Sequence, residues 1–293
     1  MAKYGFIGTG LMGNAMAFNL IQAGNELVVY NRDASKCENL VQAGAQQVGS
    51  ALEVIAAADI TFCMVSDPQA AMSVCFSPHG VIQGIAPGKS YIDMSTVDPQ
   101  TAQKIAISVQ ARGGQYLEAP VSGSLQPAKD GELVIIAAGD QSLWEQAQPA
   151  FAVMGKKSLF LGDVGAAASM KLAVNMMMGS MMTVFTEALT LVQKCDINAE
   201  QLLDVLQSGA LSCPMFSSKG AAILAENFTP NFPLKHMQKD LRLAVQLGDE
   251  KQLPMASVAT ANEIFKRACQ QELSELDMCA VMKTLANQVT ASR

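Results

Sequence analysis

The segment Lys3-Tyr4-Gly5-Phe6-Ile7-Gly8-Thr9-Gly10-Leu11-Met12-Gly13 decides the fold of this chain. Its apolar first half has the pattern of a β-strand, and the glycine-rich turn after it leads into a helical pattern over Met12–Ala23 that ends at Gly24. A GxGxxG string alone is a weak signal, but between a strand and a helix it predicts a dinucleotide-binding turn. The first glycine permits the tight turn, the second admits the pyrophosphate, and the third lets helix and strand pack closely, with the phosphates at the helix N-terminus. The predicted cofactor-binding residues of this turn are Gly8, Thr9, Gly10, Leu11, Met12 and Gly13.

Strand and helix patterns alternate through the first half of the chain, with glycines where helices stop. Ser35–Ala43 is predicted as a helix with Ser35 as its N-cap. Because alternating strands and helices form right-handed βαβ units, the sequence predicts an α/β Rossmann domain with a mainly parallel sheet. The further predicted strands are Leu27–Tyr30, Ile60–Val65, Tyr91–Asp93, Leu133–Ala138 and Ser158–Leu161.

The pattern changes near Gly162-Asp163-Val164-Gly165, after which no strand pattern occurs. One long helix, rich in methionine, is predicted over Ala166–Lys194, and methionine is typical of core or subunit packing. We therefore predict two domains, a cofactor-binding Rossmann domain at 1–162 and an all-helical substrate and oligomerisation domain at 163–293. The later predicted helices are Ala199–Gln207, Lys219–Glu226, Pro233–Leu247 and Val258–Ala268.

The composition is that of a globular protein, since 50% of the 293 residues are apolar and only 16% are charged. Disordered and fibrous classes are excluded. The net charge is −6, whereas proteins that bind nucleic acids or anionic membranes non-specifically are usually basic, so neither partner is expected. The uncharged stretch Leu172–Thr186 is shorter than the roughly 20 residues of a membrane-spanning helix, which predicts a soluble protein.

Seven cysteines and two histidines are scattered along the chain without a CxxC pair. We therefore expect no metal site of the Cys/His type. Scattered free thiols fit a reducing compartment, and a cytoplasmic location is expected. The first residues have no targeting pattern, because glycine interrupts any apolar core, although an organellar presequence removed before residue 1 would leave the same sequence.

The end of the second strand decides between NAD and NADP, and it reads Tyr30-Asn31-Arg32-Asp33. An NAD site usually has an acidic residue here for the ribose 2′-OH, but Asn31 takes that place and Arg32 follows. A guanidinium suits a 2′-phosphate in charge and geometry, and Lys36 adds a second positive charge. We therefore predict NADP, as NADPH, bound here by Asn31, Arg32 and Lys36. The alternative is that both cations are ordinary solvated surface charges.

Further motifs follow in a fixed order along the chain, and together with the glycine-rich turn they resemble the β-hydroxyacid dehydrogenase family over nearly the whole sequence. These motifs are Asp93-Met94-Ser95-Thr96, Glu118-Ala119-Pro120-Val121-Ser122-Gly123-Ser124, Gly165-x₅-Lys171-x₃-Asn175 and Lys235-His236-x₂-Lys239-Asp240. Within the family, three segments are similar to the glyoxylate and succinic semialdehyde reductases. These segments are Asn31-Arg32, Ser66-Asp67-Pro68 and Phe232-Pro233-Leu234-Lys235-His236.

The resemblance implies an activity and a set of site residues. The implied activity is NADPH-dependent reduction of short aldehydes that carry a carboxylate, from glyoxylate to glycolate and from succinic semialdehyde to 4-hydroxybutyrate. The implied residues are catalytic Lys171 and Asn175, substrate-binding Ser122, Gly123, Phe232, Lys239 and Asp240, and cofactor-binding Val65, Ser66, Thr96 and Lys239.

These residue types suit the implied chemistry. Negative charge grows on the carbonyl oxygen as hydride arrives, and the ammonium of Lys171 can stabilise and protonate that oxygen. Asn175 follows four residues later on the same helix face. The surrounding residues are mostly apolar, and a buried lysine without a function is costly. Backbone N–H groups and the small hydroxyl at Ser122-Gly123 can hold a carboxylate.

Two alternatives stay open on the sequence. One is an NAD(P)-dependent 3-hydroxyisobutyrate-type dehydrogenase or tartronate semialdehyde reductase. The pair Asn31-Arg32 argues against the NAD-dependent form of such an enzyme. The other is a non-catalytic dehydrogenase-like scaffold associated with chromatin, which the resemblance also reaches through Asp59-Ile60-Thr61-Phe62 and Met278-Cys279-Ala280-Val281. That scaffold lacks the catalytic lysine that is present here. A homodimer or homotetramer is expected, and the sequence does not rank glyoxylate against succinic semialdehyde.

Overall fold

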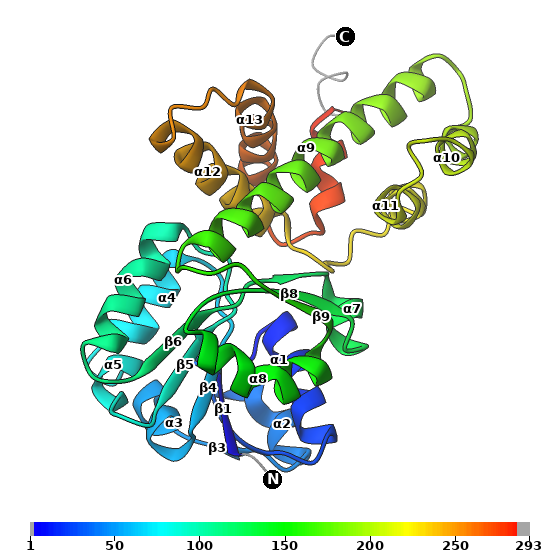
Figure 1. The fold of residues 1–293 in the computed structure, drawn as a ribbon. Helices are drawn as coiled ribbons and strands as arrows, with labels where there is room; N and C mark the ends of the chain where they lie inside the picture. The colour runs from blue at the N-terminus through cyan, green and yellow to red at the C-terminus, as the bar shows by residue number, and fades with distance from the viewer. Residues whose placement is uncertain (1–2, 286–293) are drawn as a thin grey trace. The chain divides into compact units, whose positions relative to one another are not determined.

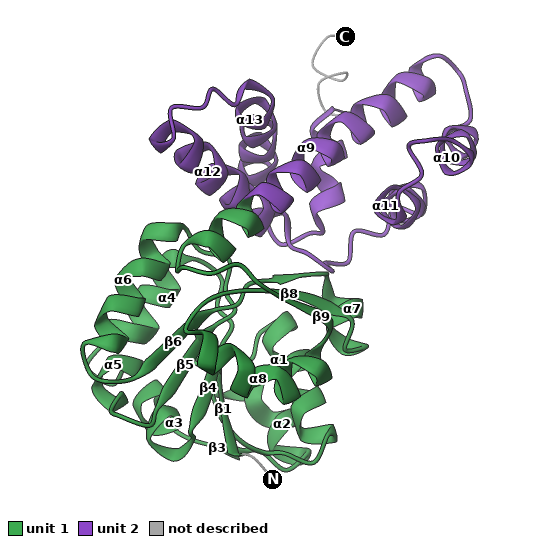
Figure 2. Ribbon diagram, in the orientation of Figure 1, with its two compact units in different colours: residues 1–172 green, residues 173–293 purple. Residues whose placement is uncertain are grey.

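The computed structural model describes residues 3–285, which form two compact units. Unit 1 comprises residues 1–172 and unit 2 comprises residues 173–293, and Figure 2 colours them separately. Unit 1 holds the sheet with its covering helices, whereas unit 2 is helical (Figure 1). The division falls inside the long helix, whose first seven residues belong to unit 1.

The sheet of unit 1 is mainly parallel, as predicted. Strands β3-β2-β1-β4-β5-β6 lie parallel in that order, which is the order of the doubly wound dinucleotide-binding sheet. Strand β8 pairs antiparallel with β6 and β7 and parallel with β9. The strands are β1 (Lys3–Ile7), β2 (Glu26–Tyr30), β3 (Gln46–Gln47), β4 (Ile60–Cys63), β5 (Ser90–Asp93), β6 (Gln115–Glu118), β7 (Val121–Ser122), β8 (Leu133–Gly139) and β9 (Gly155–Phe160).

Helices cover both faces of this sheet (Figure 1). Successive residues of a strand point to opposite faces, so Phe6 joins one buried apolar cluster and Ile7 the other. The first cluster includes side chains of α1, α2, α7 and α8, and the second includes side chains of α3 to α6. The helices are α1 (Leu11–Gln22), η1 (Ala34–Cys37), α2 (Glu38–Gln42), α3 (Ala51–Ala57), α4 (Pro68–Phe76), α5 (Val81–Gly84), α6 (Pro99–Gln110), α7 (Leu125–Lys129) and α8 (Gln141–Met154).

The strand order reverses between β1 and β4, and ligands of such sheets bind beyond the carboxyl ends of the strands at this point. The turn Gly8–Gly13 follows β1, and the segment that begins at Met64 follows β4. The segment that begins at Met94 follows β5, next in the sheet. The fold therefore brings three of the predicted cofactor-binding segments to one edge.

Unit 2 is built on α9, whose bounds agree with the predicted long helix. Gly179 lets α9 approach α12 closely, because a Cβ there would lie 2.8 Å from the Met237 sulfur and 2.9 Å from Leu241. No strand is assigned between residues 173 and 285, as the sequence predicts. The helices are α9 (Ala166–Lys194), α10 (Ala199–Ser208), α11 (Pro214–Leu224), α12 (Leu234–Glu250), α13 (Ala256–Gln270) and η2 (Met278–Met282).

Helix α9 is long and apolar enough, by length and composition alone, to cross a membrane. The uncharged part Leu172–Thr186 is too short for this, but the whole helix of 29 residues is long enough. Core helices of soluble proteins reach the same length and composition. Met182, Phe185 and Leu189 are buried in unit 2, as the side chains of a core helix are.

The prediction that Ser35 caps the helix after β2 is wrong. The helical segment after β2 begins with η1, and Asp33 is its N-cap, with its carboxylate accepting from the backbone N–H of Ser35 at 3.2 Å. The Ser35 hydroxyl donates to the same oxygen at 2.7 Å. Asp and Ser are about equally good N-caps, and Asp33 takes the position because the helical turn begins one residue before Ser35, at Ala34.

Candidate active site

The glycine-rich turn has the geometry that its three glycines predict. Gly8 has a φ of +88°, and a Cβ there would clash with the carbonyl oxygen of Met64. A Cβ on Gly13 would clash with the carbonyl oxygen of Gly8, so helix α1 could not approach the strand. Gly10 differs, because a Cβ there would meet nothing within 4 Å. The open space at Gly10 and the N-terminus of α1 therefore fit a dinucleotide pyrophosphate.

Asn31 braces this turn. Its side-chain oxygen accepts from the backbone N–H of Thr9 at 3.0 Å, and its amide nitrogen donates to the carbonyl oxygen of Asp33 at 2.9 Å. The Thr9 hydroxyl lies 3.4 Å from the sulfur of buried Cys37. Asn31 was predicted to bind the cofactor, and the structure places its amide on the protein backbone of the cofactor-binding turn.

Two cations lie beside the turn. Arg32 and Lys36 are both exposed. Between them, Asp33 is engaged in capping η1, and hydrogen bonds from the side chain and backbone of Ser35 lower its pKa. The carboxylate of Asp33 is thus turned to its own helix start. A guanidinium has the charge and geometry that a phosphate group requires.

The ends of β4 and β5 are linked by hydrogen bonds. The backbone N–H of Val65 donates to the Ser95 hydroxyl at 3.0 Å, and the N–H of Met94 donates to the Cys63 carbonyl at 2.8 Å. Ser66 is exposed and Thr96 is half-buried. The predicted residues Val65, Ser66 and Thr96 therefore follow two adjacent strands at the edge where ligands bind.

The predicted carboxylate anchor lies where β7 ends. Ser122 is half-buried and pairs with Val134 of β8, and Gly123 is exposed. Gly123 has a φ of +134°, and a Cβ there would lie 2.7 Å from the Leu133 side chain. This corner therefore requires glycine, and its exposed backbone leaves room for a small anion.

Lys171 and Asn175 lie one turn apart on α9 and are buried, at 6% and 2% exposure. The Asn175 amide nitrogen donates to the Asp240 carboxylate at 2.6 Å. The same carboxylate lies 2.7 Å from the ammonium of Lys239, so Asp240 joins α9 to a second lysine on α12. Three of the predicted residues, Asn175, Lys239 and Asp240, thus form one buried polar cluster in unit 2.

Phe232 precedes α12 and is half-buried, with its ring centroid 6.4 Å from that of His236. Its backbone N–H donates to the Asp277 carboxylate at 3.2 Å. Asp277 and its partner Lys219 had no role predicted from the sequence. A sequence signal existed, because Asp277 stands directly before a run of buried apolar residues, where an acidic residue often caps a helix.

Glu118 is a further buried carboxylate that had no predicted role. It is 1% exposed at the end of β6, and one oxygen accepts from the N–H of Gly165 at 2.6 Å and of Ala167 at 2.9 Å. Burial raises its pKa to about 7, against the opposing effect of these backbone N–H groups. Glu118 therefore holds the first turn of α9, the helix that carries Lys171.

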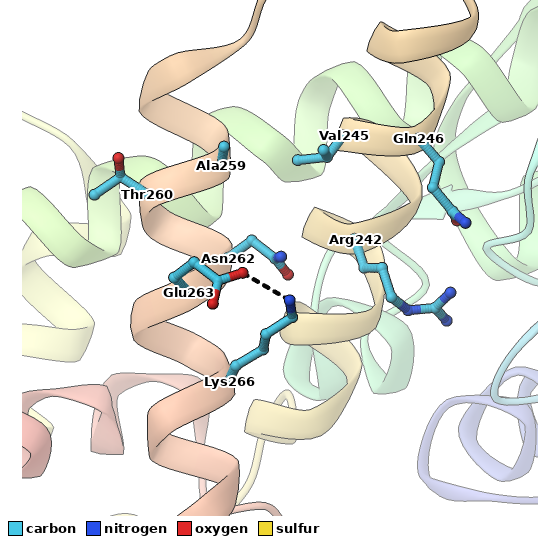
Figure 3. A pocket seen from close by; sticks show the side chains of 8 residues that line it. All are labelled: Arg242, Val245, Gln246, Ala259, Thr260, Asn262, Glu263 and Lys266. Atoms are coloured by element: carbon cyan, nitrogen blue, oxygen red, sulfur yellow. Dashed lines mark hydrogen bonds and ion pairs between the residues drawn. The ribbon is translucent and has the colours of Figure 1, made fainter.

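A groove of about 410 Å³ between α12 and α13 is shown in Figure 3. Glu263 and Lys266 form an ion pair at 2.6 Å across one turn of its wall, whereas Arg242 extends away from that pair. None of the predicted site residues lines this groove. Both members of this ion pair are exposed, so the groove is a solvated surface feature.

Comparisons with known proteins cover both units. Residues 3–162 match the family model described as the NAD binding domain of 6-phosphogluconate dehydrogenase. Residues 165–285 match the model described as the NAD-binding of NADP-dependent 3-hydroxyisobutyrate dehydrogenase. A solved 3-hydroxyisobutyrate dehydrogenase from Salmonella typhimurium has a TM-score of 0.89 at 25% identity and covers 97% of this chain and 100% of its own.

Two curated relatives are more similar in sequence. Glyoxylate/succinic semialdehyde reductase 1 of Arabidopsis thaliana is 50% identical over 97% of this chain and 98% of its own length. Cytokine-like nuclear factor N-PAC of Homo sapiens is 48% identical over 96% of this chain, which spans only 51% of that longer protein. With two family models across both units and a half-identical relative of the same length, the chain belongs to the β-hydroxyacid dehydrogenase family, whose members are nicotinamide-dependent oxidoreductases acting on alcohol and aldehyde groups.

Proposed function

We propose that this chain reduces short aldehydes bearing a carboxylate, glyoxylate and succinic semialdehyde, with NADPH as the hydride donor. The observation that carries the proposal is the buried Lys171 one turn before Asn175, whose amide is bound to buried Asp240. Burying a lysine is unfavourable unless its charge is used, and titratable groups in apolar surroundings mark functional sites. The half-identical reductase from Arabidopsis thaliana supports the same substrate class.

Lys171 is the proton donor in this proposal. A bound reduced nicotinamide supplies hydride to the carbonyl carbon. The ammonium of Lys171 donates a hydrogen bond to the carbonyl oxygen, stabilises its growing negative charge and transfers a proton to it. Asn175 offers a second hydrogen-bonding group from the same face of α9, and the 2.6 Å bond that its amide nitrogen donates to Asp240 fixes the amide.

The substrate carboxylate is assigned to Ser122 and Gly123. The hydroxyl and the exposed backbone N–H groups of this corner can bind an anion without adding bulk. Phe232 forms an apolar wall, and Lys239 lends positive charge while paired with Asp240. An uncharged aldehyde such as butanal should therefore be a poor substrate beside succinic semialdehyde.

NADPH is preferred over NADH in this proposal because exposed Arg32 and Lys36 flank the turn while Asp33 caps its own helix. Gly8, Gly10 and Gly13 shape the pyrophosphate site. The buried or scattered free cysteines of the described residues support a cytoplasmic location.

A scaffold role is the second candidate, because the N-PAC proteins are nearly as similar as the reductase. A 3-hydroxyisobutyrate-type dehydrogenase is the third. Steady-state kinetics with glyoxylate, succinic semialdehyde, tartronate semialdehyde and 3-hydroxyisobutyrate, each with both cofactors, separates them. We expect the two reductase substrates to have the highest kcat/KM with NADPH. Turnover of none of them would support the scaffold, and a preference for 3-hydroxyisobutyrate would support the dehydrogenase.

A further inference from the structure

Unit 2 contains a buried ion pair that takes no part in the proposed chemistry. Lys219 on α11 is 9% exposed and Asp277, the N-cap of η2, is 2% exposed. The Lys219 ammonium lies 2.8 Å from both carboxylate oxygens. The loss of hydration offsets much of the attraction between two buried charges, so stability alone is a weak reason for such a pair.

The Asp277 carboxylate also accepts hydrogen bonds from three backbone N–H groups. One oxygen accepts from Asn231 at 3.0 Å and from Phe232 at 3.2 Å, and the other accepts from Cys279 at 3.1 Å. Burial raises the pKa of Asp277, but the hydrogen bond and charge of Lys219, together with the N–H groups, outweigh burial and lower that pKa below its usual value. The carboxylate is therefore ionised at neutral pH and accepts all of these bonds.

The segment before α12 is held from the same place by backbone hydrogen bonds. The N–H of Asp277 donates to the Phe228 carbonyl at 2.9 Å, and the N–H of Met278 donates to the Phe232 carbonyl at 2.9 Å. Phe232 is thus bound through both its N–H and its carbonyl. The first turn of α12 has no side-chain cap at Pro233, and its N–H groups at Leu234 and Lys235 donate instead to the carbonyls of Leu276 and Ser274. The N–H of Phe232 itself is held by the Asp277 carboxylate.

We propose that Asp277 and Lys219 are positioning residues, which fix the Phe232 ring and thereby set the preference for aldehyde acids with methylene groups between the aldehyde and the carboxylate. The inference rests on the proposed function, in which Phe232 forms an apolar wall for substrate. In glyoxylate the aldehyde carbon is bonded directly to the carboxylate carbon. Succinic semialdehyde has two methylene groups between them, and these can lie against a phenyl ring.

Lys219→Met tests the pair, because it keeps the side-chain length but leaves Asp277 without its cation. We expect KM for succinic semialdehyde to rise about ten-fold, the effect of losing apolar contact with two methylene groups. KM for glyoxylate and both kcat values should stay nearly unchanged. The matched control is Lys235→Met, which breaks the exposed pair of Lys235 with Glu275, 2.6 Å apart, near the same helix start. This control should leave both KM values as in the wild type.

Phe232→Ala separates the positioning role from the proposed function. We expect Phe232→Ala to raise the same KM, and Lys219→Met added to it should change the KM ratio of the two acids no further. A wild type that reduces neither acid overturns the proposed function and this inference with it. A wild type that reduces both acids, with a KM ratio that Phe232→Ala leaves unchanged, overturns the wall role of Phe232 and this inference but leaves the reductase activity standing. If Phe232→Ala shifts the KM ratio of the two acids but a folded Lys219→Met protein keeps the wild-type ratio, only the positioning role is overturned.

A second variant keeps the test open if Lys219→Met fails to fold in a thermal melt. Lys219→Met combined with Asp277→Asn removes both charges, so no buried charge is left without its partner. The asparagine amide has a single acceptor oxygen, so it can accept from some of the three N–H groups but not from all of them. We expect the same rise in KM for succinic semialdehyde alone, and equal effects on both acids would contradict the inference.

Discussion

Arg32 is the residue on which the cofactor preference depends. Its guanidinium is exposed beside the turn, and the neighbouring carboxylate of Asp33 is committed to capping η1. Charge-assisted hydrogen bonds are worth about 1.5–3 kcal/mol, so Arg32→Ala should weaken NADPH binding by about 10–150-fold. Binding of NADH should hardly change. Fluorescence titration of both cofactors measures this, with Arg112→Ala, an exposed arginine after α6, as the control. An equal loss for both cofactors would contradict the assignment.

Lys171 is the residue on which the chemistry depends. Lys171→Met keeps the buried volume of the side chain and removes its proton. General acid catalysis contributes about 10²–10⁴-fold, and kcat should fall by at least that factor while NADPH still binds. Lys171→Arg should rescue poorly, because arginine keeps its charge but does not readily release a proton. A Lys171→Met enzyme with near-normal kcat and intact cofactor binding would show that Lys171 is structural.

The Gly123 corner changes how the carboxylate anchor should be tested. The sequence suggests Gly123→Val as a variant that blocks the anchor without unfolding the protein. In the structure, the positive φ and the nearness of Leu133 make any side chain at this position strained. Ser122→Ala avoids this strain. It should raise KM for both aldehyde acids and leave the slow reduction of butanal unchanged, as measured by steady-state kinetics.

At the scale of elements, prediction succeeded where local signals were strong. Helix α9 was predicted at its observed bounds, because twenty-nine residues of helical pattern follow a glycine at position 165. The sequence did not indicate β3, which has two residues, or β6, whose Gln115 and Glu118 break the apolar pattern. Such short strands are fixed by pairing with their neighbours in the sheet, and propensity alone does not specify them.

Glu118, which joins β6 to α9, should make the free energy of unfolding depend on pH. Folded Glu118 has a pKa raised from 4.5 to about 7, mainly by burial, with Asp93 on β5 adding to the shift. Between these values the folded carboxyl is protonated and the unfolded one is ionised, so unfolding releases a proton. The free energy of unfolding should therefore fall by about 3 kcal/mol as pH rises from 4.5 to above 7.

Glu118→Gln isolates this effect. The amide oxygen can still accept from Gly165 and Ala167, but the group no longer titrates. Urea denaturation between pH 5 and 8 should show a smaller decline of the unfolding free energy in the variant than in the wild type. Because other groups cancel in the difference, parallel curves for the two proteins would refute the assignment.

At the scale of the whole molecule, the cofactor turn and the fold class were predictable, but the polar clusters were not. The turn is local, and its glycines sit where strand and helix require them. Asn175 and Asp240 are 65 residues apart, and Lys219 and Asp277 are 58 apart. No periodicity or spacing in one sequence indicates such pairs, because tertiary packing of the helices brings them together. Asp240 and Lys239 were assigned through the family resemblance, whereas no motif of that resemblance includes Lys219.

Helix α9 has a surface that the described chain does not cover. Met170, Met177, Val184 and Leu191 are exposed apolar residues at intervals of seven, which places them along one side of the helix. An exposed apolar stripe of this kind marks an interaction surface, and a second copy of the chain presents the same stripe. We predict that the wild type is a homodimer or homotetramer held by this stripe.

Met177→Glu combined with Val184→Glu should reduce the mass of the protein in light scattering to that of a monomer, since each buried charge would oppose association. Gln193→Glu, an exposed polar position of α9 outside the stripe, should leave the mass unchanged. A monomeric wild type, or a double variant with wild-type mass, would show that the stripe has no part in assembly.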